Sequence, residues 1–371
     1  MTYLASNFKY SPFLAYLFCV LFYSLLVILY DFTSFGITNL VFVDGVNWTL
    51  FVRDISNGIY DLSDIRSSEL FLYTNYILYF IGGTLLVFLF NISILSNLFL
   101  RSSSPLLILF IPFYVTCSFL VSKDILVLVC TLAYFYFLVR NKTIYLFIVS
   151  VISFYIRDGF GFFLLLFTVI NYLNLFSIRY LILAIASMLI IDFFITTLNE
   201  IYPTFMLGRT LNISSEIGIQ YPYILRLVGN IFNLATRPVF FTEQGSFSLT
   251  SFTLFLSGVG IIFSFFHSFY NLFFCRASLT IVHKRVIFML LYSFVLLSFS
   301  PLVQPRYLIS IAYIYIMYFS LYPFFKSQFI FFLTLSFMVT IFGFFMYLLL
   351  GNTPIITDDY NVTPLDIISN V

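Results

Sequence analysis

Long apolar runs recur from one end of this chain to the other, and they constrain its fold more than any other feature. They predict eleven membrane spans, several of them short, at residues 12–30, 71–90, 105–121, 124–139, 143–156, 159–176, 180–198, 252–275, 286–300, 307–325 and 328–350. Only 9% of the residues are charged, whereas soluble proteins carry about a quarter. Because a helix satisfies its own backbone polar groups in lipid, the sequence predicts an all-α, polytopic membrane protein with one transmembrane domain over residues 1–371.

The distribution of charge predicts how these helices cross the membrane. With the N-terminus inside, the cytoplasmic loops collect nine basic residues and no acidic residue: Lys9, Arg101, Arg140, Lys142, Arg179, Arg276, Lys284, Arg285 and Lys326. The acidic residues then lie outside, except that Asp192 lies in the outer part of a span. The positive-inside rule therefore favours this orientation, with the C-terminus outside. The outer side comprises a first loop at 31–70, a main loop at 199–251 and a tail at 351–371.

The main outer loop contains a pattern typical of an amphipathic helix. Arg226, Asn230, Asn233 and Arg237 recur at helical spacing and fall within about 60° of one another on a helical wheel. The opposite face of the same segment is apolar. We therefore expect a helix that lies on the membrane surface, with a cationic and amide-bearing stripe facing the water.

Basic residues on the outer side run against the orientation rule, and they are the first candidate site. There are eight of them, and seven are arginine: Arg53, Arg66, Lys123, Arg157, Arg209, Arg226, Arg237 and Arg306. A guanidinium keeps its charge and can bind phosphate oxygens in a bidentate manner, so such a set suits a diphosphate at the membrane surface. The simpler interpretation is that each cation pairs with an adjacent acid, as in Lys123–Asp124 and Arg157–Asp158, or extends to lipid headgroups.

We predict that six of these cations bind diphosphate: Lys123, Arg157, Arg209, Arg226, Arg237 and Arg306. Asn230, Asn233 and Tyr307 are candidate contacts to a sugar. Asp124 and Asp158 lie near the membrane boundary, where a carboxylate can act as a general base or merely neutralise a nearby cation.

Several kinds of site are not expected. The acidic residues form no Asp-X-Asp or Glu-Glu pair, and Asp61 and Asp64 are a weak metal signal, so we expect neither a metal nor another cofactor. His267 is expected to be a hydrogen-bonded core residue within a span, and His283 to lie in a cytoplasmic loop, which leaves no histidine outside. The cysteines have no zinc-like spacing. No feature indicates nucleic-acid binding.

Three short segments are similar to a pattern in proteins of surface-polysaccharide clusters. They are Pro112–Tyr114, Ser122–Leu126 and Ile156–Gly159, in which a proline-aromatic span leads to Lys-Asp and the next hairpin ends in Ile-Arg. Together with the number of spans and the arginine-bearing outer loop, they make the chain resemble bacterial O-antigen polymerases of the Wzy type.

This resemblance implies glycosyl transfer at the periplasmic face of the bacterial inner membrane. A growing glycan would pass from undecaprenyl diphosphate to the terminal sugar of a new lipid-linked repeat unit. Outer arginines would stabilise the departing diphosphate, and Asp124 or Asp158 would serve as the base. The implied partners are the undecaprenyl-diphosphate-linked oligosaccharide, the lipid bilayer, a chain-length regulator and a flippase.

Two alternatives stay open. One is a glycosyltransferase that uses a lipid-phosphate sugar, with Asp44 or Asp54 as the base, although the acidic pair of that class is missing. The other is a lipid-linked oligosaccharide flippase, which would carry mid-span charges and internal pseudo-symmetry that the sequence lacks. An O-antigen ligase is disfavoured because no histidine is expected outside.

Overall fold

Helices account for nearly all of the structure, which is a computed structural model. It describes residues 11–29, 37–38, 43–58, 70–100, 104–187, 247–275, 279–297 and 306–349. The predicted amphipathic helix, most of the main loop and the predicted tail lie outside the described residues. Within the described part, the predicted all-α class is confirmed, since the only strands there, β1 (Ile37–Thr38) and β2 (Phe247–Ser248), are two residues long and pair in parallel.

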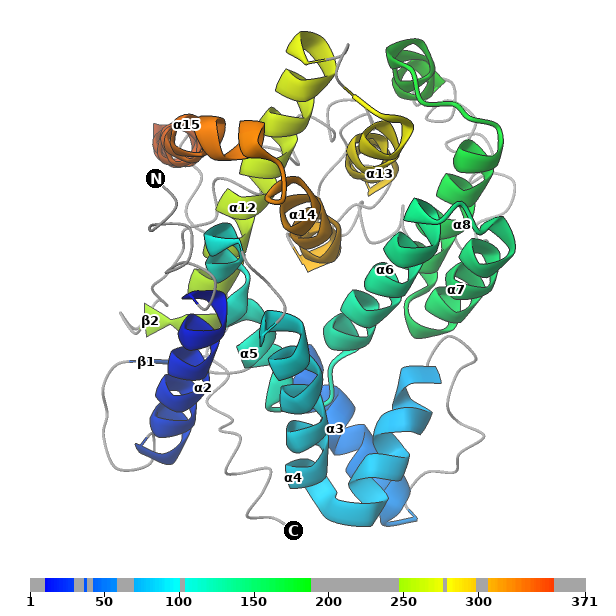
Figure 1. The fold of residues 1–371 in the computed structure, drawn as a ribbon. Coiled ribbons are helices and arrows are strands. Elements are labelled where there is room, and N and C mark those ends of the chain that lie inside the picture. The colour runs from blue at the N-terminus through cyan, green and yellow to red at the C-terminus, as the bar shows by residue number, and fades with distance from the viewer. Residues whose placement is uncertain are drawn as a thin grey trace.

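The helices follow the apolar runs of the sequence in order (Figure 1). They are α2 (Ser11–Leu29), α3 (Val43–Ser56), α4 (Leu70–Leu100), the 3₁₀ helix η3 (Pro105–Leu109), α5 (Ile111–Ser118), α6 (Lys123–Val139), α7 (Thr143–Ile156), α8 (Asp158–Tyr172), a helix at Ile178–Ser187, α12 (Leu249–Phe274), α13 (Ile281–Leu297), α14 (Arg306–Phe319) and α15 (Pro323–Leu349). Of these, α3 was not predicted, because it lies within the first polar loop.

One described helix, α12, is long and apolar enough to cross a membrane. Its 26 residues correspond to about 39 Å at 1.5 Å per residue, more than the thickness of a hydrocarbon core. Several other apolar helices are shorter, such as Thr143–Ile156 and Leu308–Phe319. In α4 the run is interrupted at Gly82–Gly83, where Gly83 has φ 61° and ψ −159°, a conformation open to glycine. The number of spans and their orientation therefore remain predictions.

Helices α6, α7 and α8 form an antiparallel three-helix unit that is joined by short turns (Figure 1). Inside this unit, each helix contributes one hydroxyl group to a hydrogen-bonded cluster. Tyr134 Oη on α6 lies 2.9 Å from Thr168 Oγ1 on α8, and Ser150 Oγ on α7 lies 3.3 Å from the same atom. In a lipid environment, the hydrophobic effect does not drive apolar helices together. Hydrogen bonds between hydroxyl groups of neighbouring helices stabilise their association there.

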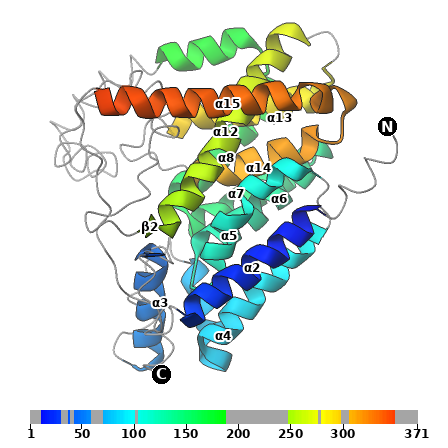
Figure 2. The ribbon, with the colours of Figure 1, turned by 90° about the vertical axis from the view of Figure 1, so that its left-hand side faces the viewer.

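The core of the other half of the bundle surrounds α14. Its Tyr313 is fully buried among the rings of Phe99, Phe110 and Tyr114, which come from α4 and from the segment between α4 and α6. Helix α15 runs across α12, as Figure 2 shows, and Phe332 of α15 packs there against aromatic rings of α12. Aromatic contacts therefore join elements that are far apart in sequence.

The two histidines can be compared with their predictions. His267 on α12 is fully buried, and its Nδ1 lies 2.8 Å from Tyr315 Oη and 3.0 Å from Asn271 Nδ2, so the prediction of a hydrogen-bonded core histidine is confirmed. The prediction that His283 lies in a loop is wrong. This residue is in the first turn of α13 and is 6% exposed, because α13 begins at Ile281, before the apolar run itself.

Candidate functional site

The beginning of α6 positions two of the predicted site residues. Ser122 is the N-cap, with an extended backbone, and its Oγ accepts a hydrogen bond from the backbone N–H of Asp124 at 3.2 Å. This cap satisfies one of the free N–H groups of the first turn, so the helix starts at Lys123. Lys123 and Asp124 therefore project from the first turn of α6.

The turn between α7 and α8 consists of a single residue, Arg157. Its N–H donates to the Ser153 carbonyl at 2.8 Å, and its own carbonyl accepts from the Gly161 N–H at 2.9 Å. With φ −152° and ψ 104°, Arg157 is extended between two helices. Its side chain is therefore fixed at the end of the hairpin, and Asp158, whose side chain is not described, begins α8 directly after it.

An ion pair joins these two elements. Arg157 Nη1 lies 2.9 Å from Asp124 Oδ1, and each side chain is 13% exposed. Asp124 thus contacts an arginine from the next hairpin, and Lys123 precedes it directly in sequence. At this exposure the pair is only partly solvated, so its attraction is screened less than that of a surface pair. The structure brings Lys123, Asp124 and Arg157 together.

An unpredicted element, α3, covers this cluster. Lys123 Nζ lies 4.3 Å from the centre of the Trp48 ring, a cation–π contact. On the next residue of α3, Thr49 Oγ1 accepts a hydrogen bond from the Val121 N–H at 3.1 Å. Trp48, Phe51, Val52 and Ile55 recur at helical spacing in the sequence, and this spacing is the signal that could have predicted α3.

Some predicted residues can be placed only by their backbone. Arg306 and Tyr307 form the first turn of α14, but their side chains are not described. Arg209, Arg226, Arg237, Asn230 and Asn233 lie outside the described residues. Whether these groups converge on the Lys123–Asp124–Arg157 cluster therefore stays a prediction.

The residues of the alternative glycosyltransferase site lie on α3. Asp54 pairs with its neighbour Arg53, with 3.3 Å between Oδ1 and Nη2 and with both side chains 25% exposed. Asp44 is in the first turn of α3, with an undescribed side chain. Among the described residues, no three side chains of His, Cys, Asp or Glu gather as metal ligands do, and the four cysteines are free thiols.

The cluster combines two chemical abilities at the end of one hairpin. Guanidinium and ammonium groups can neutralise phosphate charge, and an ionised carboxylate beside them can accept a proton from a hydroxyl group. Comparison with family models, with curated proteins and with solved structures found no match to this chain. Its function is therefore inferred from its own residues and contacts.

Proposed function

We propose that the chain is a glycosyltransferase of the bacterial inner membrane, which polymerises a surface polysaccharide such as O-antigen. The observation that supports this most directly is the ion pair of Arg157 with Asp124, beside Lys123. Two cations and one carboxylate therefore lie at one end of α6, α7 and α8. The charge distribution assigns this end to the periplasmic side. That combination suits a reaction in which a diphosphate leaves and a hydroxyl group loses its proton.

In the proposed reaction, the terminal sugar hydroxyl of a new lipid-linked repeat unit attacks the anomeric carbon of the growing glycan. The bond from that carbon to the phosphate oxygen breaks, and undecaprenyl diphosphate departs with the electron pair. Asp124 or Asp158 accepts the hydroxyl proton. Lys123, Arg157 and the arginines predicted to join them stabilise the charge that develops on the diphosphate. Because the arginines among these cations keep their charge, the reaction is expected to need neither metal nor nucleotide.

Arg157 has a second role in this proposal. Its Nη1 lies 2.9 Å from Asp124 Oδ1 and so fixes the position of the carboxylate proposed as the general base. A guanidinium has five N–H donors, so its geometry allows contact with a carboxylate and a phosphate at the same time. When the diphosphate binds, Arg157 would bring the base and the leaving group into one arrangement.

A reconstituted assay tests the proposal. The purified full-length chain in lipid vesicles is supplied with undecaprenyl-diphosphate repeat units from the strain that encodes it, in the presence of a metal chelator. We expect a ladder of longer glycans on the lipid and release of free undecaprenyl diphosphate. Absence of growth with an intact, folded protein would overturn the proposal.

The same assay distinguishes the alternatives. A requirement for a divalent metal, or for a monophosphate-linked sugar, would favour the glycosyltransferase with Asp44 or Asp54 as its base. Movement of the lipid-linked unit across the vesicle membrane without chain growth would favour a flippase.

Substitutions connect the activity to the cluster. Arg157→Ala is expected to lower chain growth by about 100-fold or more, since one lost donor to a developing oxyanion costs about that much. Arg53→Ala is the matched control, because Arg53 is also an outer arginine paired with an aspartate but is not part of the cluster. Equal growth by the two variants would contradict the role of Arg157.

A further inference from the structure

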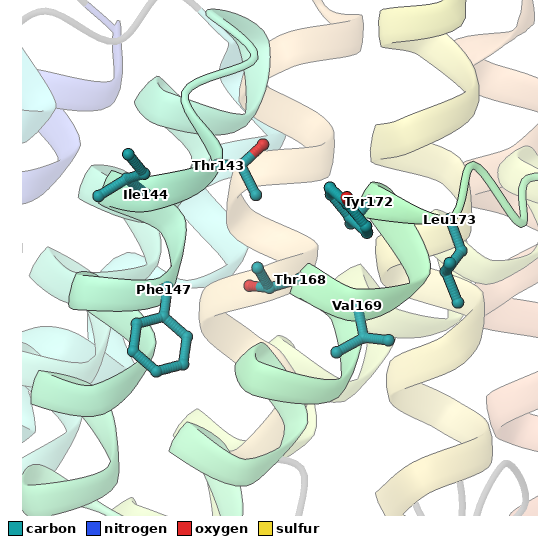
Figure 3. Close-up of a pocket in the computed structure, with 7 residues that line it drawn as sticks. All are labelled: Thr143, Ile144, Phe147, Thr168, Val169, Tyr172 and Leu173. Atoms are coloured by element: carbon teal, nitrogen blue, oxygen red, sulfur yellow. The ribbon is translucent and has the colours of Figure 1, made fainter.

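An apolar groove lies between α7 and α8, at the opposite end of the hairpin from Arg157. It has a volume of about 350 Å³ and is lined by side chains from both helices. Figure 3 shows these residues, which are Thr143, Ile144, Phe147, Thr168, Val169, Tyr172 and Leu173. Its walls are hydrocarbon, and the Thr168 hydroxyl already contacts Tyr134, Ser150 and the Leu164 carbonyl. The groove therefore suits a hydrocarbon chain.

The sides of the groove continue into an exposed apolar surface. Ile144 and Tyr172 are each 75% exposed, and Phe147 is 56% exposed. A contiguous exposed surface of this kind marks contact with another apolar phase. Because the proposed function places α7 and α8 in the membrane, that phase is the acyl region of the bilayer.

The end of the groove is cationic. Thr143 directly follows Lys142, which is the N-cap of α7 and is exposed, and Arg140 lies two residues earlier with its guanidinium 4.0 Å from the Tyr136 ring. Arg285 of α13 reaches the same turn, where its Nη2 lies 2.8 Å from Asn141 Oδ1. Arg140 and Lys142 therefore lie in the turn between α6 and α7 that leads into the groove, and Arg285 contacts the same turn.

No carboxylate is available nearby in sequence to neutralise these cations. Between Asp124 and Asp192 the chain has one acidic residue, Asp158, which begins α8 at the far end of the hairpin. The segment 276–300, which contains Arg285, has no acidic residue. These cations thus have no acidic neighbour in sequence, and their positive charge is complementary to an anionic headgroup.

The length of the helices places that anion at the level of a lipid headgroup. α7 has 14 residues and spans about 21 Å, whereas the hydrocarbon core of a bilayer is about 30 Å thick. A short hairpin thins the bilayer around it and draws phosphate groups towards its ends. Lys142 and Arg140, with their long side chains, are placed to meet those phosphates.

We propose that this groove binds an acidic glycerophospholipid of the cytoplasmic leaflet, with one acyl chain between Ile144 and Val169 and with its phosphate at Lys142 and Arg140. The inference rests on the membrane placement of the proposed function and not on its chemistry. It assigns to the hairpin a lipid contact at one end and the diphosphate cluster at the other.

Photocrosslinking of lipids tests this inference. The full-length protein in nanodiscs receives phosphatidylglycerol or phosphatidylcholine that carries the same diazirine acyl chain. Trypsin cuts after Lys142, Arg157 and Arg179, so the two walls of the groove are recovered in the peptides 143–157 and 158–179. We expect about fivefold or greater labelling of these peptides by phosphatidylglycerol over phosphatidylcholine, which matches about 1 kcal/mol for one cation near the surface.

Two variants make the test specific. Lys142→Gln is expected to lower the phosphatidylglycerol preference about fivefold; this variant lacks the trypsin site at 142, so its α7 wall is recovered in the peptide 141–157. Lys284→Gln removes a cation from the same predicted side and is expected to leave the preference unchanged. Equal labelling by the two lipids, or an equal effect of the two variants, would overturn the inference. Selective labelling in a protein that fails to extend glycans would overturn the proposed function alone.

Discussion

Arg157 occupies the single position between α7 and α8, and its guanidinium pairs with a carboxylate 33 residues earlier in the chain. The turn already fixes the backbone of Arg157, so forming the pair costs less backbone entropy than it would for an arginine in a long loop. With 13% of each side chain exposed, removal of one partner leaves a largely desolvated charge behind. The pair therefore stabilises the contact between α6 and the hairpin whatever its chemical role.

Asp124→Asn tests this structural part. It keeps the shape of the side chain but removes its charge, and we expect a loss of about 1–3 kcal/mol of stability because Arg157 becomes an unpaired, partly buried cation. The thermal midpoint of the full-length protein in nanodiscs measures the loss.

A charge-swapped double variant, Asp124→Arg with Arg157→Asp, separates stability from chemistry. It restores an ion pair with the two charges exchanged between the positions, so most of the lost stability is expected to return. Chain growth is expected to stay low in this variant, because the carboxylate and the guanidinium have both left the positions that the proposed chemistry requires. Recovery of both stability and chain growth would exclude Asp124 as the base and leave Asp158.

His283 carries a second prediction, which concerns pH. The Thr280 N–H donates to His283 Nδ1 at 3.1 Å, and the His283 N–H donates to Thr280 Oγ1 at 3.3 Å, so the two residues form a reciprocal cap at the start of α13. Burial lowers the pKa of His283, which precedes the predicted span. Protonation of Nδ1 would remove its acceptor and break the cap.

The sign of the pH dependence follows from that shift. In the unfolded chain His283 is protonated below about pH 6.5. In the folded chain it stays neutral to a lower pH, so the free energy of unfolding rises with pH in this range. The contribution is complete above about pH 6.5 and is lost as the pH falls towards the lower folded pKa. We expect the thermal midpoint to drop between about pH 7 and about pH 5.

The control is His283→Gln. Glutamine at this position can still reach back to the N–H of the capping residue, but it does not titrate. The variant is therefore expected to keep α13 intact and to show a smaller decrease in the midpoint on acidification. An unchanged decrease would assign the pH dependence to other groups.

Among the elements, α7 shows what the sequence can predict. The predicted span 143–156 has the same bounds as the observed helix, because the apolar run is flanked directly by Lys142 and Arg157. In α4, by contrast, the predicted span stops at residue 90 while the helix continues to Leu100. Asn91 does not end it, since its Nδ2 donates to the Ser118 carbonyl at 3.2 Å and is buried. Such a tertiary partner is not visible in a local pattern.

The candidate site was predictable only in part, for the same reason. Its residue types follow from the charge pattern, but the partner of Asp124 depends on how the α7–α8 hairpin packs on α6. From the sequence, the adjacent pairs were Lys123 with Asp124 and Arg157 with Asp158, whereas in the structure Arg157 pairs with Asp124. Likewise, α3 brings Trp48 to Lys123 through packing contacts that the polar composition of the first loop does not reveal.

Two glycines of α8 provide an element-level prediction. A Cβ on Gly161 would collide with the backbone of Phe154 on α7, whereas a Cβ on Gly159 would meet open space. Gly161→Ala is therefore expected to push the two helices apart and to cost about 1–3 kcal/mol. Gly159→Ala, two residues away in the same helix, is the matched control and is expected to be nearly neutral. Equal thermal midpoints would contradict this account of the hairpin.

At the scale of the whole molecule, the described contacts separate into two groups of charged residues. Asp124 and Arg157 meet near α3, while Arg285 contacts Asn141 at the other end of the three-helix unit. The charge distribution assigned the first group to the outer side and the second to the inner side. The contacts thus bring together residues that were predicted to share a side.

Labelling in cells tests that assignment. Asn57, directly after α3, and Lys142, at the start of α7, are both exposed, and each can be replaced by cysteine after Cys19 and Cys275 are changed to serine. We expect a membrane-impermeant maleimide to label Asn57→Cys once it reaches the periplasm, and Lys142→Cys only after the inner membrane is permeabilised. Labelling of both from the same side would contradict the predicted orientation.

The one-residue turn at Arg157 also bears on how the chain is made. A hairpin without a loop can enter the membrane as one unit, since hardly any polar backbone has to be carried across. In the predicted topology, only the Arg157–Asp158 end must reach the far side, and Asp124 has been synthesised before it. During insertion, the Asp124 carboxylate on α6 would therefore already be in place when Arg157 arrives. The ion pair between them would then hold the hairpin in its predicted transmembrane position.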